Sequence, residues 1–150
     1  MAESQTLQSV VVDVPVRTAY NQWTQFEEFP KFMGGAEKVE QRSPEVVYWK
    51  VNIAGRTVEY EADILEQIPD KRIVWRSRAG KKTGGVVEFE ALGPDRTRVT
   101  LDMTYEPQGV LENIGDLLGI VSNRTHQDLE NFKKLIESRG VETGAWRGQI

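Results

Sequence analysis

This sequence contains no cysteine and only one histidine. Without thiols the chain has no disulfide framework, no thiolate metal site and no cysteine nucleophile. A single imidazole does not form a histidine cluster for a metal. We therefore expect no metal, no nucleotide and no other cofactor.

Long hydrophobic runs and an excess of basic residues are missing as well. No window approaches the roughly 18 apolar residues of a membrane-spanning helix, and the first ten residues lack the basic and apolar regions of a signal peptide. Nineteen basic residues against 23 acidic ones give a net charge of −4, whereas a face that binds nucleic acid needs clustered Lys and Arg. We expect a cytoplasmic domain with no nucleic-acid partner and no stable membrane insertion, and a homodimer stays open.

What the chain does have is a long amphipathic segment near its end, residues 111–139. Its apolar residues recur in steps of three and four, which place them on one face of a helix: Ile114, Leu117, Leu118, Val121, Leu129, Phe132, Leu135 and Ile136. Gly140 is typical of a helix stop. A helix with one such face needs a large apolar partner surface.

The middle of the chain predicts that partner, because alternating residues and turn residues indicate seven strands. The predicted strands are 5–14, 37–43, 46–54, 56–68, 71–79, 85–92 and 96–106. Short connections among the last six favour antiparallel hairpins. Two short helices are expected at 16–23 and 26–33. Residues 1–140 should form one domain and residues 141–150 a tail, in which Trp146 could dock.

Alternation also assigns the two faces of this sheet. One face collects apolar side chains, including many bulky aromatics. In the strand 85–92 this inward face is assigned to Val87, Phe89 and Ala91. The other face carries acidic residues opposite arginines on adjacent strands, as is typical of a solvated sheet face. An apolar sheet face covered by one long helix predicts an α+β sandwich. The inward aromatics could fill a core or line an interior pocket.

Three segments resemble a known family: Val12 to Val16, Trp23 to Met33, and Arg98 to Pro107. They look like the polyketide cyclase/dehydrase branch of the START-like (SRPBCC) superfamily, and the resemblance covers roughly residues 5–139. It implies a helix-grip fold, in which a seven-stranded antiparallel sheet wraps around the long C-terminal helix. It also implies an elongated cavity between sheet and helix that receives a hydrophobic or polycyclic ligand.

Candidate site residues follow from the predicted faces. The cavity should be lined by Trp49, Tyr60, Trp75, Ser77, Phe89, Tyr105, Leu118, Val121 and Thr125. Asp128 falls within about 40° of the centre of the apolar helix stripe. Because a buried unpaired carboxylate is costly, Asp128 should either pair with an arginine at the sheet rim or serve as a catalytic or ligand-anchoring group. His126 should face solvent or the helix flank.

Three functions stay open at this point. The first is binding or carriage of a hydrophobic small molecule, as in lipid-binding members of the superfamily. The second is an aromatase/cyclase or dehydratase that acts on a polyketide-like substrate, although the inward positions of the strand 56–68 hold no Arg or Ser to assist it. The third is a structural or regulatory protein that uses the fold without a ligand.

Overall fold

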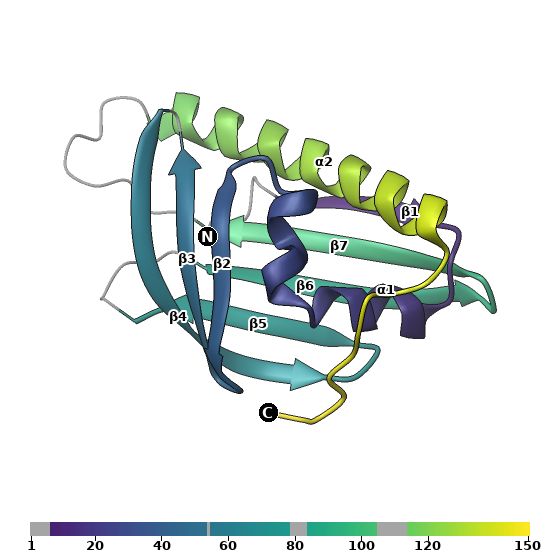
Figure 1. The fold of residues 1–150 in the computed structure, drawn as a ribbon. Coiled ribbons are helices and arrows are strands. Elements are labelled where there is room, and N and C mark those ends of the chain that lie inside the picture. Colours follow the sequence, from purple (N-terminus) through teal and green to yellow (C-terminus); the bar gives the residue numbers. More distant parts are fainter. Residues whose placement is uncertain (1–6, 54, 79–83, 105–113) are drawn as a thin grey trace.

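The computed structural model describes residues 7–53, 55–78, 84–104 and 114–150. Seven antiparallel strands form one curled sheet in the order β1-β7-β6-β5-β4-β3-β2, and the helices lie on its concave side (Figure 1). This α+β arrangement is the predicted helix-grip fold. The elements in chain order are β1 (Gln8–Val12), α1 (Val16–Trp23), η1 (Phe26–Lys31), β2 (Ala36–Ser43), β3 (Val46–Ile53), β4 (Arg56–Ile68), β5 (Arg72–Ser77), β6 (Gly84–Gly93), β7 (Arg96–Thr104) and α2 (Ile114–Arg139).

Helix α2 covers the sheet through its apolar stripe and crosses above β1 and β7 (Figure 1). In its second half Leu129, Phe132 and Ile136 are completely buried. The helix ends where predicted, because Gly140 adopts a φ of 77° and its N–H donates to the Ile136 carbonyl at 2.7 Å. Glycine is favoured in this left-handed conformation. The predicted start at residue 111 lies outside the described residues.

The predicted inward face of the sheet is largely buried, with two departures. Ala91 is exposed, because it lies close to the β6–β7 turn, where a register irregularity separates it from Gly93. In β4 a register shift between Ile64 and Glu66 leaves Leu65 exposed and turns Gln67 inward, where it is 1% exposed. A bulge of this kind reverses the alternation that follows it.

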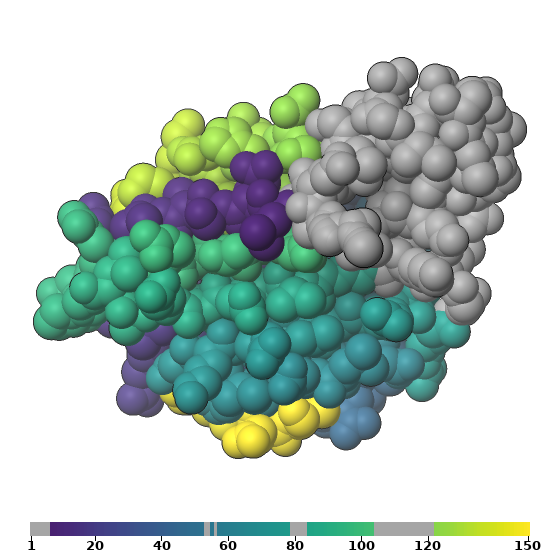
Figure 2. All heavy atoms as spheres, turned by 180° about the vertical axis from the view of Figure 1, so that it is seen from behind, coloured from purple at the N-terminus to yellow at the C-terminus, as the bar shows by residue number. Residues whose placement is uncertain are grey.

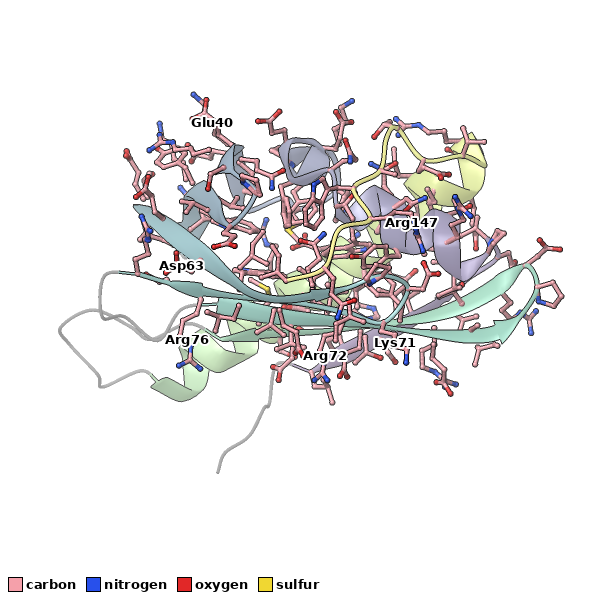
Figure 3. All side chains as sticks on the ribbon, turned by 90° about the horizontal axis from the view of Figure 1, so that it is seen from below. Glu40, Asp63, Lys71, Arg72, Arg76 and Arg147 are labelled. Carbon is pink, nitrogen blue, oxygen red and sulfur yellow. The ribbon has the colours of Figure 1, made fainter. Side chains whose placement is uncertain are left out.

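The opposite face carries the predicted charge ladder. Arg72 and Arg76 point away from the helices there (Figure 3). Exposed ion pairs link neighbouring strands, among them Arg98–Glu90 at 2.8 Å between β7 and β6 and Arg72–Glu88 at 3.5 Å between β5 and β6. Another pair, Arg42–Glu61 at 2.9 Å, reaches from β2 across β3 to β4. Such exposed pairs contribute only tenths of a kcal/mol each. Figure 2 shows this outer face, with the strands at the surface over most of its area.

The residues after Gly140 run back along α1 to the lower edge of the sheet (Figures 1 and 2). Ile150 exchanges two backbone hydrogen bonds with Gln67, both 3.0 Å long. Arg147 bonds to Asn21 at 2.7 Å and to Asp70 at 2.8 Å. The backbone N–H of Trp146 donates to the Thr24 hydroxyl at 3.1 Å. Two of these contacts reach buried polar side chains, Asn21 of α1 and Thr24 just after it, each 2% exposed.

Candidate binding site on the concave face

Three aromatic side chains stand together on the concave face of neighbouring strands: Trp49 on β3, Tyr60 on β4 and Trp75 on β5. The rings of Trp49 and Trp75 are stacked, with centroids 5.6 Å apart and an interplanar angle of 15°. Trp49 and Tyr60 are stacked at 6.2 Å and 7°. All three side chains are at most 7% exposed. We call Trp49, Tyr60 and Trp75 the aromatic wall.

Small residues on the sheet make room for this wall. Trp49 and Trp75 belong to strands separated by β4, which presents Ala62 between Tyr60 and Ile64 on the same face. On the other side, Trp75 is paired with Gly85 of β6. A Cβ atom added to Gly85 would lie only 2.9 Å from Cε2 of the Trp75 indole. The glycine is therefore required by the ring that lies over it.

The two indole N–H groups of the aromatic wall are buried, and neither finds a hydrogen-bond partner among the residues that the structure describes. Trp49 is 1% exposed and Trp75 is 2% exposed. A buried donor without a partner costs about 1–3 kcal/mol, so such groups are uncommon in folded proteins. The concave face thus combines a large apolar surface with the indole N–H groups of Trp49 and Trp75, which make no hydrogen bond to the described residues.

The other predicted lining residues lie in several places. Ser77 and Thr125 are buried, at 7% and 1% exposure, and both already take part in interactions. Phe89 packs edge-on against Tyr20 of α1, with centroids 5.4 Å apart, and so contributes to the core beneath α1. Tyr105 and the side chains of Leu118 and Val121 lie outside the described residues.

Asp128 is enclosed, as its place on the helix stripe predicts, with 7% exposure. One of its carboxylate oxygens accepts a hydrogen bond from the Gly34 N–H at 3.0 Å. Burial raises the pKa of Asp128 from 3.8 to about 7, although the Gly34 N–H and the positive charge of Arg124 both act to lower it. The positive charge that acts on this carboxyl therefore comes from its own helix, one turn earlier, and not from the sheet rim.

Around Asp128, helix α2 holds the loop between η1 and β2. The Asn131 amide donates to the Phe32 carbonyl at 3.1 Å. The Arg124 guanidinium lies so close to Gly34 that an added Cβ there would be 2.6 Å from Nη1. Sequence reasoning missed Arg124 and Gly34 as neighbours of Asp128. The i, i+4 spacing of Arg124 and Asp128 was an available signal, whereas the contact with Gly34 spans 94 residues.

Outside this region, His126 is exposed, as predicted. Two open surface hollows, of about 420 Å³ and 410 Å³, lie away from the aromatic wall. The first is bounded by η1, β2 and Trp146, and the second lies on the sheet near Arg72 and Arg98. Over the described ranges no three His, Cys, Asp or Glu side chains gather as metal ligands do. In the same part of the chain, no helix combines the length and hydropathy needed to cross a membrane.

Comparison with known proteins first defines the class. The Zhui aromatase/cyclase from Streptomyces sp. R1128 superimposes with a TM-score of 0.73 at 18% identity, over 93% of this chain and 97% of that one. A START superfamily protein from Mycobacterium smegmatis superimposes with a TM-score of 0.64 at 19% identity, over 89% and 94% of the two chains. At these identities the likeness shows a shared helix-grip fold.

The family is then established from the sequence. A family model described as "Polyketide cyclase / dehydrase and lipid transport" matches residues 12–134, so the chain belongs to this family. It is also 49% identical over 148 residues to an uncharacterized 17.2 kDa protein from the melC2-rnhH intergenic region of Streptomyces lincolnensis, which covers 98% of this chain and 99% of the relative. The predicted family is confirmed.

Proposed function

We propose that this domain binds a hydrophobic, ring-containing small molecule against the aromatic wall of its concave face. The observation that carries the proposal is the stack of Trp49, Tyr60 and Trp75. Aromatic side chains offer a large contact area at a low cost in conformational entropy. The family, whose description covers both polyketide cyclases and lipid transport, supports a ligand of this kind.

Apolar contact alone should give measurable affinity. Removal of apolar surface from water contributes about 25 cal/mol per Å², and several kcal/mol of that gain offset the loss of translational and rotational freedom. A three-ring ligand should therefore bind in the micromolar range without any charged contact.

Tryptophan emission provides the test. Titration with polycyclic aromatics, quinones and fatty acids should produce a saturable shift or quench, because two tryptophans belong to the aromatic wall. Trp75→Ala should weaken binding by about 1–3 kcal/mol, which is roughly 5- to 150-fold. Tyr48→Ala is the matched control: Tyr48 precedes Trp49 on β3 but faces outward, under the Arg42 guanidinium at 4.3 Å. Absence of saturation with every ligand would favour the structural role instead.

A cyclase or dehydratase function is the second candidate, and Asp128 is the observation that favours it. A buried carboxyl with a pKa raised to about 7 exists in both protonation states near neutral pH, which suits general acid–base catalysis. Under this hypothesis Asp128→Asn should bind a poly-β-ketone substrate as well as the wild type does, yet form no cyclised product. Equal product yields from both proteins would remove Asp128 from any catalytic role.

Two further predictions concern the whole protein. Cell fractionation tests the expected cytoplasmic location, and analytical ultracentrifugation tests whether the domain forms a homodimer.

A further inference from the structure

Two adjacent glycines between η1 and β2 are held from two sides. On one side the Gly34 N–H donates to a carboxyl oxygen of Asp128 on α2 at 3.0 Å. On the other side the Asn52 N–H, near the end of β3, donates to the Gly35 carbonyl oxygen at 2.7 Å. We call Gly34 and Gly35 the glycine turn. It joins α2 to the end of β3, a strand of the aromatic wall, and lies beneath the helix in the view of Figure 1.

The glycine turn can move without disturbing the core on either side of it. Its neighbours Met33 and Ala36 are 4% and 7% exposed, whereas Gly34 is exposed and Gly35 is half-buried. Glycine adopts a wider range of backbone conformations than any other residue. Two glycines at the surface, between two buried residues, therefore form a short segment that can open while the rest stays folded.

We propose that the glycine turn is a pH-dependent latch that stays closed while Asp128 is protonated, opens more often once Asp128 is ionised, and so controls the access of a ligand to the concave face. The control of access rests on the proposed function, because it concerns a ligand at the aromatic wall. The opening of the latch is a property of the protein alone and can be measured without a ligand.

The burial of Asp128 sets the direction of the effect. In the closed form burial raises the pKa of Asp128 to about 7, although the Gly34 N–H and Arg124, one turn earlier on α2, both act to lower it. Within the described ranges Arg124 is the charged side chain that acts on this carboxyl, since the glycine turn carries no side chain and Asn52 of β3 is uncharged. An open turn admits water and returns the pKa of Asp128 towards 3.8. Because the open form ionises at a lower pH than the closed form, loss of the proton favours opening.

Amide hydrogen exchange of the full chain, followed by NMR, measures the opening. The Gly34 N–H exchanges when its bond to Asp128 breaks, so its protection factor, corrected for the intrinsic pH dependence of exchange, shows how often the latch opens. With a pKa of about 7 in the closed form and 3.8 in the open form, protection should fall about 20-fold from about pH 5.5 to about pH 7.5. At both pH values Gly34 should exchange at least about tenfold faster than the slowest amides of the protein, which exchange only through global unfolding.

Three variants separate the ionisation of Asp128 from other causes. Asp128→Asn should abolish the pH dependence of Gly34 protection, because the amide does not titrate. Glu130→Gln removes a neighbouring carboxylate of α2 and should preserve the pH dependence. Asn131→Ala removes the hydrogen bond to the Phe32 carbonyl, so it should lower the protection about 2- to 10-fold at both pH values and leave their ratio unchanged.

The probe for ligand entry is 9-fluorenone, a planar three-ring ketone with no ionisable group. Its association rate, followed by stopped-flow tryptophan fluorescence, should rise with pH in the wild type as the protection of Gly34 falls, and should stay constant in Asp128→Asn. A wild-type association rate that is the same at both pH values would overturn the control of entry. If neither 9-fluorenone nor any of the ligands titrated above binds, the proposed function fails, and hydrogen exchange still decides whether the latch exists.

Three results of the exchange experiment would refute the latch. The first is equal protection of Gly34 at the two pH values, and the second is a wild-type pH dependence in Asp128→Asn. The third is exchange of Gly34 that is as slow as that of the slowest amides, since the turn would then open only when the whole domain unfolds. Should the variants fail to fold, the pH dependence of the wild type and its comparison with the slowest amides decide.

Discussion

Replacing Asp128 by asparagine should change how the stability of this domain depends on pH. In the folded protein burial raises the pKa of Asp128 from 3.8 to about 7. The unfolded chain therefore ionises this carboxyl at a lower pH than the folded chain does. Stability contributed by the neutral carboxyl is fully present below about pH 4 and is lost as the pH rises to about 7.

The size of the effect follows from the two pKa values. A difference of about three units corresponds to about 4 kcal/mol over the whole transition, and to about 3 kcal/mol between about pH 4.5 and about pH 8. Asparagine has nearly the same shape and carries no charge, and its amide oxygen can still accept the hydrogen bond from the Gly34 N–H. The variant should lack this component of the pH dependence.

Urea unfolding at the two pH values measures the effect, and the quantity of interest is the stability of Asp128→Asn minus that of the wild type. This difference should rise by about 3 kcal/mol from the acidic to the alkaline condition. Asp63→Asn is the control, because it alters an exposed ion pair with Arg78 and should give a difference that varies by less than about 1 kcal/mol. If the Asp128→Asn difference is the same at both pH values, Asp128 is not held in the environment described above.

Three substitutions test the packing around the site and the tail. Gly85→Ala should lower the unfolding free energy by about 1–3 kcal/mol in urea denaturation, because its methyl group would overlap the Trp75 indole; unchanged stability would mean that this ring lies elsewhere. Gly140→Ala should cost about 1 kcal/mol in the same assay, since its φ is 77°, and a gain in stability would argue against this helix end. Arg147→Ala removes the bonds to Asn21 and Asp70 that hold the tail. Hydrogen exchange at the backbone N–H of Gln67, which donates to the Ile150 carbonyl, should therefore become faster, and an unchanged rate would show that the tail is held by other contacts.

Local patterns in the sequence predicted most of the fold. Strict alternation placed Trp49, Tyr60 and Trp75 on one face, because the side-chain period of a strand leaves no other choice. The position of Gln67 could not be obtained in this way, since one bulge at Leu65 reverses the pattern and nothing local identifies it. Ala91 was assigned inward for a similar reason: alternation in the sequence continues up to the β6–β7 turn, whereas the register of β6 becomes irregular between Ala91 and Gly93.

The site shows the same division between local and distant information. Burial of Asp128 followed from the helical period alone. Its hydrogen bond to Gly34 depends on a loop 94 residues away, and the docking of Arg147 on Asn21 spans 126 residues. Contacts of this range arise from the whole packed structure. The need for glycine at position 85 became visible only once its register with Trp75 was known.

The central claim is that the concave aromatic wall is a ligand site, and the indole N–H region of a ¹H–¹⁵N NMR spectrum tests it most directly. The chain has four tryptophans, whose signals can be assigned with single Trp→Phe variants. On titration with 9-fluorenone the signals of Trp49 and Trp75 should shift saturably, while those of Trp23 and Trp146 stay nearly unchanged. The claim is contradicted if the largest saturable shift belongs to Trp146 or Trp23, or if no indole signal moves at all.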